Sequence, residues 1–134
     1  MTVFVDASFL FALFNRDDEF YPKAIEIAGS LKESTACLLT SNIVLAETVN
    51  LVFRDQGPKA ARDFAKSFRK SKVEEFFVPD ELFQKAYQFL FAQKSRRGLN
   101  LFDCLHLATM DSLGINTILS FDKGFKRKVE VMGI

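Results

Sequence analysis

Short apolar runs, each separated from the next by a longer segment of helical pattern, constrain the fold of this chain most strongly. Four such runs stand out and a fifth is weaker, at 3–5, 37–39, 74–78, 117–121 and 129–131. They do not alternate apolar with polar residues, which indicates strands buried on both faces. We therefore predict an α/β fold with three layers, α/β/α, around a central parallel sheet of four or five short strands.

The segments between these runs carry the residues that start and stop helices. Helices are predicted at 8–14, 21–32, 42 to about 54, 58 to about 70, 80–90 and 101 to Gly114. Ser41 and Asn42 are suitable N-cap residues, and Pro58 suits a first helical turn, where its missing N–H is not needed. We find no repeats, linkers or low-complexity segments, so residues 1–134 are predicted to form one domain.

The composition narrows the class of protein. Of the 134 residues 49% are hydrophobic, with sixteen Phe and no Trp, which suffices for a core and leaves some Phe for a partner subunit. The net charge of +1 means that nucleic-acid binding would need a local basic patch. The two cysteines, Cys37 and Cys104, lie in apolar runs and are predicted to be small buried hydrophobic residues in a reducing compartment.

Other classes of protein are disfavoured. The single His, His106, and the lack of a CxxC pair argue against a zinc site. The first residues show neither a basic region nor a cleavage-site pattern, and no apolar run reaches the length of a membrane span. We therefore expect a soluble, cytoplasmic domain without membrane contact.

Four carboxylates stand where an acid is costly or unexpected. Asp6 and Asp122 directly follow two predicted strands, and parallel strands would bring them to the same edge of the sheet. Asp103 opens the helix of the nearly apolar segment LFDCLHLATM, and Glu47 lies on an apolar surface near a helix start. Carboxylates gathered at one edge would repel one another unless they shared a cation. Oxygen ligands without His or Cys select Mg²⁺ or Mn²⁺.

The segments VFVDAS, NIVLAETVNL, NLFDCLHLATM and TILSFDKGF resemble, in this order and over essentially the whole chain, the PIN domain family. The resemblance implies a Mg²⁺- or Mn²⁺-dependent endoribonuclease that hydrolyses RNA phosphodiester bonds with one or two ions. Small members of the family are commonly VapC-type toxins paired with a small antitoxin, and a homodimer is implied as well. The implied catalytic and metal-binding residues are Asp6, Glu47, Asp103 and Asp122.

Further residues follow from the resemblance and from their position. Ser8 stands where the family has Ser or Thr to hydrogen-bond an acid or a metal-bound water, and Ser120 has a similar place. Asn50, one turn from Glu47, is a candidate supporting residue or an exposed Asn. Two departures, Asn100 in place of Ser or Thr and Tyr21 in place of His, leave open how substrate is held.

Two basic clusters flank the predicted acid edge and are candidates for contacts with the RNA backbone. They are Lys94, Arg96 and Arg97 before the Asp103 helix, and Lys123, Lys126, Arg127 and Lys128 after Asp122. Ordinary solvated charge explains both clusters equally well. No base-reading motif is visible, so sequence specificity does not follow.

Each acid also has a purely structural explanation. Asp6 with Ser8 would cap a helix, Asp122 would make a turn, Glu47 would pair with a buried Arg, and Asp103 would be an N-cap. His106 is interpreted as a satisfied core residue or a partner of a ligand. Two alternative functions stay open: a non-catalytic or housekeeping nucleic-acid-binding PIN module, and a receiver-type domain phosphorylated on an Asp beside Lys123.

Overall fold

The computed structural model describes residues 1–126 and 129–133. Within these ranges five strands form one sheet in the order β3-β2-β1-β4-β5, and every neighbouring pair is parallel. The strands are β1 (Thr2–Val5), β2 (Cys37–Ser41), β3 (Glu74–Phe76), β4 (Thr117–Leu119) and β5 (Glu130–Met132). The predicted parallel α/β fold is confirmed.

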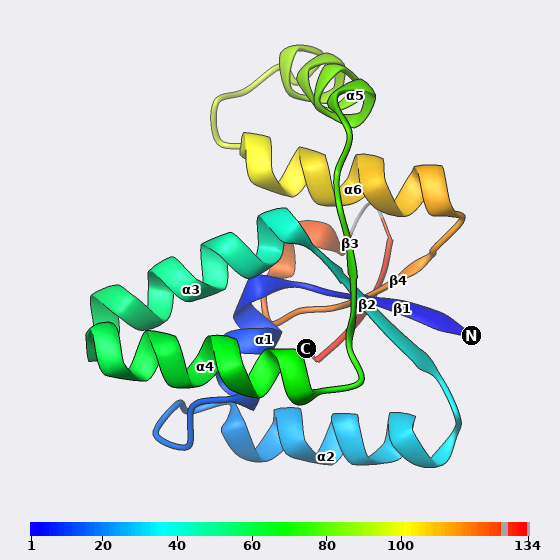
Figure 1. The fold of residues 1–134 in the computed structure, drawn as a ribbon. Coiled ribbons are helices and arrows are strands. Elements are labelled where there is room, and N and C mark those ends of the chain that lie inside the picture. The colour runs from blue at the N-terminus through cyan, green and yellow to red at the C-terminus, as the bar shows by residue number, and fades with distance from the viewer. Residues whose placement is uncertain (127–128, 134) are drawn as a thin grey trace.

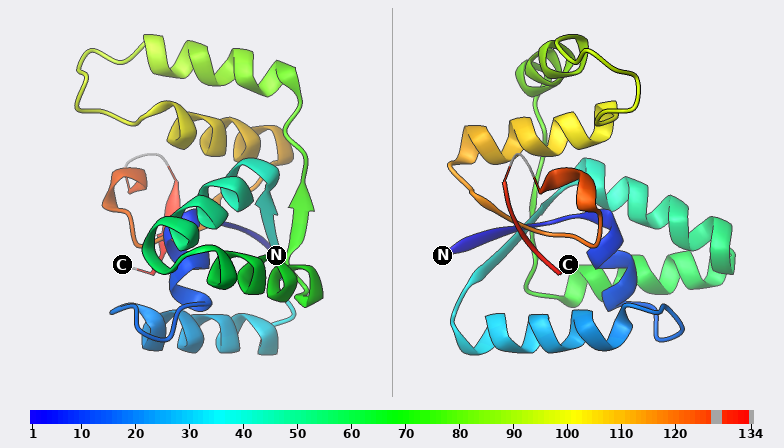
Figure 2. Two further views of the ribbon diagram at one scale, coloured as in Figure 1. Left: turned by 60° about the vertical axis from the view of Figure 1, so that its left-hand side comes forward. Right: turned by 180° about the vertical axis from the view of Figure 1, so that it is seen from behind.

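Helices cover the sheet on both faces. They are α1 (Ala7–Leu13), α2 (Tyr21–Glu33), α3 (Asn42–Gln56), α4 (Pro58–Lys70), α5 (Asp80–Phe91) and α6 (Leu101–Leu113), with a short 3₁₀ turn η1 (Lys123–Phe125). In Figure 1 the α5–α6 pair lies above the sheet and α2 lies below it, while α3 and α4 project to the left. The views in Figure 2 show α5 stacked on the outer side of α6.

The element boundaries differ from the sequence prediction mainly at the strand ends. Strand β2 runs on to Ser41, which pairs with Phe76, because the parallel ladder with β3 continues. Strands β3 and β4 end early, at Phe76 and Leu119. After β3 the chain is held by a side chain instead of a strand, since Val78 N donates to Asn42 Oδ1 at 2.8 Å.

Strand β1 lies at the centre of the core. Its Val3, Phe4 and Val5 are almost completely buried, which explains why the sequence there is apolar on both faces. A smaller apolar cluster joins α5 to α6 through Ala86 and Leu105. Because α6 is covered by α5 on one side and by the sheet on the other, its segment is apolar nearly all round.

The helix ends follow the predicted capping residues. Ser41 caps α3 by accepting a hydrogen bond from Val44 N at 3.1 Å. Gly114 ends α6 in the left-handed conformation, with φ of 68°, which costs a glycine little. The predicted burial of Cys37 is wrong: Cys37 is exposed, whereas Cys104 is buried as predicted. Cys37 is the first residue of β2, at the end of the strand that the helices leave uncovered.

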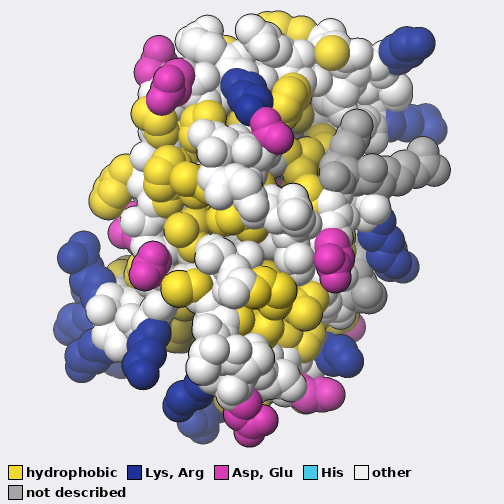
Figure 3. All heavy atoms as spheres, turned by 90° about the vertical axis from the view of Figure 1, so that its right-hand side faces the viewer, with side chains coloured by type: hydrophobic (Ala, Val, Ile, Leu, Met, Phe, Trp, Pro, Cys, Tyr) yellow, Lys and Arg dark blue, Asp and Glu magenta, His cyan; other side chains and the backbone are white. Residues whose placement is uncertain are grey.

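The side of the molecule that carries the N-terminus mixes apolar and charged side chains (Figure 3). No His side chain is visible on this face, in keeping with the burial of His106. In the described part of the chain, no helix combines the length and the apolar character needed to cross a membrane.

Candidate active site

The parallel pairing of β1 with β4 brings distant parts of the sequence to one edge of the sheet. Phe4 pairs with Ile118 and Val5 with Leu119. Asp6, the next residue, continues this pairing, because its N–H donates to Leu119 O at 3.0 Å. The first predicted acid and the turn that carries Asp122 therefore lie together at the carboxyl end of the sheet, where ligand sites of parallel α/β proteins form.

Asp6 is buried and held by a network of hydroxyl groups. Ser120 Oγ donates to Asp6 Oδ2 at 2.7 Å, and Ser8 Oγ reaches the same oxygen at 3.2 Å. The other oxygen, Oδ1, accepts from Ala7 N at 2.7 Å, so Asp6 also caps α1. The predicted capping role and the predicted clustering with Ser8 and Ser120 are thus both seen in the structure.

The same two serines connect Asp6 to the turn after β4. Phe121 N donates to Ser8 Oγ and Asp122 N donates to Ser120 Oγ, each at 3.0 Å. Each hydroxyl therefore accepts from the backbone of the turn while it faces Asp6. Because Ser120 is completely buried, this network fixes the start of the Asp122 turn relative to the Asp6 carboxylate.

Glu47 extends from α3 towards the carboxyl end of the sheet and contacts His106, the only His in the sequence. Its Oε1 lies 2.8 Å from His106 Nε2, and the same Nε2 lies 3.9 Å from Asp6 Oδ1. The expectation of a buried Arg partner for Glu47 is wrong, because the cation-forming group there is an imidazole from α6. The second interpretation of His106, a partner of a candidate ligand, is the one that the contacts support.

Asp103 and Asp122 also hold structural roles, because each accepts a hydrogen bond at the start of a helical element. Asp103 is the third residue of α6 and forms a capping box with Asn100, in which Asp103 N donates to Asn100 Oδ1 at 2.9 Å and Asn100 N to Asp103 Oδ2 at 3.2 Å. The N-cap is therefore Asn100, not Asp103. Asp122 caps η1 by accepting from Gly124 N at 2.8 Å.

The four carboxylates interact electrostatically although they come from four segments. Burial raises the pKa of Asp6; the neighbouring His106 and the Ser120 and Ala7 hydrogen bonds oppose this, while the charge of Glu47 adds to it. Burial also raises the pKa of Asp103. The hydrogen bond from Asn100 N–H and the neighbouring His106 lower this pKa, whereas the charges of Asp122 and Asp6 raise it further. These interactions link all four acids into one group.

The donor chemistry of this group fits a hard divalent ion, because the carboxylates and hydroxyls offer only oxygen. The arrangement is not a finished coordination sphere: among residues 1–126 and 129–133, no three His, Cys, Asp or Glu side chains converge as ligands of one ion. Glu47 Oε2 and Asp103 Oδ1 have no hydrogen bond in the described structure. Those oxygens are therefore available, and the carboxylates would have to draw together around an ion.

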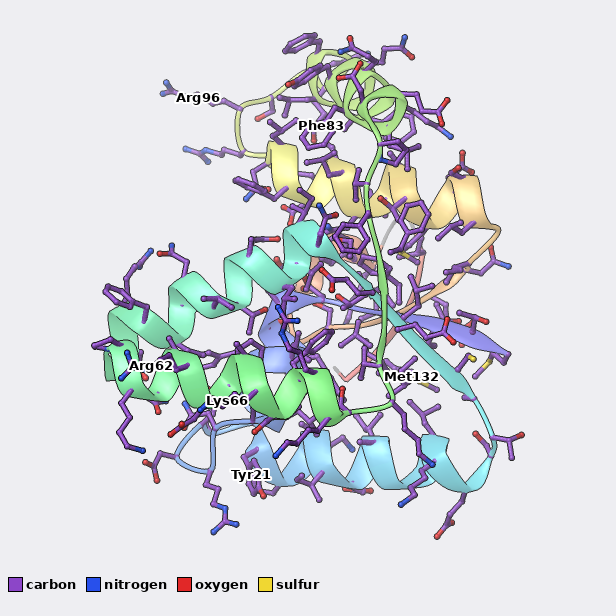
Figure 4. All side chains as sticks on the ribbon, in the orientation of Figure 1. Tyr21, Arg62, Lys66, Phe83, Arg96 and Met132 are labelled. Atoms are coloured by element: carbon purple, nitrogen blue, oxygen red, sulfur yellow. The ribbon has the colours of Figure 1, made fainter. Side chains whose placement is uncertain are left out.

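The other predicted residues lie at varying distances from the acids. Asn50 is exposed on α3, and no hydrogen bond joins it to the acids within the described residues. Lys94, Arg96 and Arg97 are exposed in the loop between α5 and α6, where Arg96 points outwards (Figure 4). Lys123 and Lys126 are exposed around η1, whereas Arg127 and Lys128 lie outside the described residues.

The α5–α6 loop is held from within by Gln93. Its side chain accepts from Leu99 N at 2.7 Å and donates to Leu99 O at 2.8 Å. A surface hollow is lined by Lys94, Arg96 and Asn100, which places two of the basic candidates near the start of α6.

His106 is the residue that the predicted site set left out. One signal was available in the sequence: His106 follows Asp103 by three residues on one helix, so both side chains lie on neighbouring parts of the same face. The sequence contains no signal that Glu47, 59 residues away, is its partner.

Comparisons with known proteins agree with this geometry. A family model described as the PIN domain matches residues 3–131. The chain resembles the crystal structure of the Mycobacterium tuberculosis toxin VapC20, described as cleaving the sarcin–ricin loop, at 30% identity and a TM-score of 0.80, with 93% of each chain covered. A comparison with curated protein sequences found no match.

More distant solved structures share the fold alone. VapBC2 from Rickettsia felis, bound to a fragment of promoter DNA, has a TM-score of 0.72 at 16% identity and 98% coverage of each chain. FitAcB from Neisseria gonorrhoeae has a TM-score of 0.66 at 16% identity, covering 98% of this chain and 96% of that one. The family model spans nearly the whole chain, and VapC20 is similar over nine-tenths of it. The chain therefore belongs to the PIN domain family and to its VapC-type members.

Proposed function

We propose that this protein is a Mg²⁺- or Mn²⁺-dependent endoribonuclease and the toxin of a toxin–antitoxin pair. The observation that carries the proposal is the position of Asp6 at the carboxyl edge of a parallel sheet, with His106 Nε2 3.9 Å from its Oδ1 and 2.8 Å from Glu47 Oε1. The charges of Asp122 and Asp6 also raise the pKa of Asp103, which extends this group to four acids. Such a group is costly by itself and becomes favourable once a divalent ion neutralises it. The likeness to a toxin that cleaves RNA of the sarcin–ricin loop supports this assignment.

The residues would divide the work as follows. Asp6, Asp103 and Asp122, with Glu47, would hold one or two ions, and Ser8 and Ser120 would keep Asp6 in place through the hydrogen bonds described above. When bound, a divalent ion supplies an activated water and neutralises charge on the scissile phosphate. Hydrolysis then breaks one phosphorus–oxygen bond of the RNA backbone.

The direct test is cleavage of RNA by the purified protein with Mn²⁺, with EDTA, and with Mn²⁺ restored. We expect cleavage with Mn²⁺, loss with EDTA and recovery on restoration. Cleavage that persists in EDTA would contradict the metal requirement.

The alternative of a non-catalytic nucleic-acid-binding module is favoured by one observation, the lack of a finished coordination sphere in the described structure. It predicts RNA binding without cleavage at any Mn²⁺ concentration. The receiver-type alternative is removed, because the chain belongs to the PIN domain family.

The basic loop between α5 and α6 would contact the RNA backbone. Each phosphate contact that is lost should lower the salt dependence of binding by about one unit of slope. We expect Arg96→Ala to lower the slope of log Kd against log salt by about this amount. Arg69→Ala on α4, equally exposed but outside the loop, is the matched control, and an equal change in both variants would make the loop charges ordinary solvated surface.

The partner and assembly proposals have separate tests. Solved relatives include complexes of toxin with antitoxin, such as one from Klebsiella pneumoniae, which supports a small antitoxin partner here. An adjacent gene for a short protein that suppresses the cleavage would identify it.

A homodimer is supported by exposed aromatic side chains such as Phe53, Phe77 and Phe91, and sedimentation gives the mass that tests it. One domain spanning residues 1–134 and a cytoplasmic location stay predictions of the sequence.

A further inference from the structure

His106 joins three segments of the candidate site although it is not one of the acids. It lies on α6, is 1% exposed, and packs its ring against Phe4 of β1 with 5.7 Å between ring centroids. Its Nε2 is 2.8 Å from Glu47 Oε1 and 3.9 Å from Asp6 Oδ1. A fully buried imidazole thus contacts a carboxylate of α3 and lies beside the carboxylate after β1.

We propose that His106 is a positioning residue, which holds the Glu47 carboxylate at the acid edge by a hydrogen bond from Nε2–H to Oε1. The inference rests on the proposed function, because the acid edge matters only if it binds an ion. A carboxylate only accepts hydrogen bonds, so the shared proton belongs to the imidazole. The bond leaves Glu47 Oε2 without a partner in the described structure, and therefore available as a ligand.

Glu47 needs such a support more than the other acids do. Its side chain has three rotatable bonds and is 29% exposed, so solvent competes for it. The charge on Asp6 repels it, and without a donor Glu47 would turn towards water. Asp6, Asp103 and Asp122 each accept a backbone N–H close in sequence, whereas the only hydrogen bond of Glu47 within the described residues comes from His106.

The second ring nitrogen, Nδ1, makes no competing hydrogen bond within the described residues. His106 Nδ1 is buried and has no hydrogen-bond partner among the residues that the structure describes. The orientation of the ring therefore depends on its packing against Phe4 and on the Nε2 contacts alone. If His106 ligated a metal while Nε2 bonds the Glu47 carboxylate, the ligand atom would have to be Nδ1, and Nδ1 is buried.

The test replaces the donor and then restores it. His106→Leu keeps an apolar side chain and removes the donor, while His106→Gln supplies an amide N–H in place of Nε2–H. Loss of a residue that orients a ligand lowers metal affinity about tenfold or more. We expect calorimetric titration with Mn²⁺ to show this loss in His106→Leu and recovery of most of it in His106→Gln. Ser112→Ala, on the exposed side of α6, should match the parent protein.

A second set of variants tests whether His106 acts through Glu47. In a Glu47→Ala background, His106→Leu should change Mn²⁺ affinity by less than about twofold, because the group that it positions is already absent. An equal loss in both backgrounds, or the same loss in His106→Leu and His106→Gln, would overturn the positioning role. If His106→Leu fails to fold, His106→Met, which also lacks a donor, takes its place in both backgrounds.

Metal-free unfolding separates failure of this inference from failure of the proposed function. If the parent protein binds no Mn²⁺, the proposed function fails, and the contact is then tested by urea unfolding of the two single variants and the double variant. Non-additive midpoints support the His106–Glu47 contact, and additive midpoints overturn it.

Discussion

The candidate site has two halves that are built differently. The half carried by the sheet consists of Asp6 and Ser120, which are buried and joined by a hydrogen bond between residues 114 positions apart, with Ser8 at the start of α1 beside them. The half carried by the helices consists of Glu47 and Asp103, is partly exposed, and is held by a single contact on each carboxylate. One half is a fixed anchor, and the other keeps carboxylate oxygens without hydrogen bonds in the described structure, which would be free to meet an ion under the proposed function.

The difference follows from how strands and helix starts hold their side chains. Residues that follow adjacent parallel strands are set by the ladder itself, so the positions of Asp6 and Ser120 depend on the whole sheet. Residues on α3 and α6 are set by helix packing, and their longer or more exposed side chains rotate about it. Removing a hydrogen-bond donor from the anchored half should therefore lower stability as well as activity, while changes in the adjustable half should affect activity with little change in stability.

The largest effect is expected for Asp6→Asn. Loss of the central anionic ligand should lower RNA cleavage by about a thousandfold or more, an effect of several kcal/mol on the barrier. Removing one of several like charges should at the same time leave the metal-free protein as stable or raise its free energy of unfolding. Cleavage rates and urea unfolding measure the two effects.

A matched control for Asp6→Asn exists on α4. Asp63 is exposed and pairs with Lys59 at 2.9 Å, so Asp63→Asn makes the same chemical change outside the site. It should leave cleavage unchanged. Turnover retained in Asp6→Asn would remove Asp6 from the catalytic group.

Asp103→Asn tests the adjustable half and should have the next largest effect. The amide oxygen of Asn is still able to accept from Asn100 N, so the capping box and the fold should persist. Cleavage should fall by about a hundredfold through the loss of one charged ligand. Kinetics together with the melting temperature measure this, and a large drop in melting temperature would show that Asp103 serves the helix rather than an ion.

Ser120→Ala should lower the stability of the protein, which distinguishes the anchored half of the site from the adjustable half. It removes a donor to the buried Asp6 Oδ2 and leaves the partly buried Asp122 N–H without its acceptor. An unsatisfied buried group costs about 1–3 kcal/mol, which urea unfolding resolves. Ser112→Ala on the exposed surface of α6 should cost almost nothing, and an equally small cost for Ser120→Ala would mean that the network does not anchor the site.

The smallest effect is expected in the pH dependence of the metal-free protein. Folding raises the pKa of Asp6 and of Asp103 above the ordinary value of 3.8, so the folded state holds their protons more tightly than the unfolded chain does. Their contribution to stability should therefore fall as pH rises from 3.8 through the raised values, and then level off. The difference between the parent protein and Asp6→Asn in urea midpoints across this range isolates Asp6, and a difference that grows in favour of the parent as pH rises would contradict the sign.

The sequence predicted the fold and the acid positions well because both depend on local patterns. Apolar runs without alternation identify buried parallel strands, and an acid at the end of such a run is visible without coordinates, as at Asp6 and Asp122. The structure joins Asp6 and Glu47 through His106, whereas no three of the predicted acids converge as ligands of one ion within the described residues. The role of the four acids in binding an ion stays a prediction. Asp103 shows the limit of this reasoning. An acid three residues after Asn100 is also explained by the capping box that the two residues form, so its position does not by itself indicate a metal ligand.

Long-range partners were the part that the sequence did not predict. Nothing in the sequence connects Glu47 to His106, or Ser8 to the backbone of Phe121. The first contact depends on how α3 and α6 pack against the sheet, and the second on how the start of α1 meets the turn after β4. Exposure at strand ends was missed for a similar reason: Cys37 lies in an apolar run, yet the helices do not reach over the start of β2. Asn50 is one turn from Glu47 in sequence, and the helix turns it outwards.

The strand order has a consequence for when the site comes into being. Strand β1 is the first to be synthesised and sits in the middle of the sheet, while its neighbour β4 begins only at residue 117. During translation Asp6 therefore lacks the hydroxyl of Ser120 until the residues that follow β4 have left the ribosome. If the protein cleaves RNA, its activity then begins only after Asp103, Ser120 and Asp122 have been synthesised and have folded into the site.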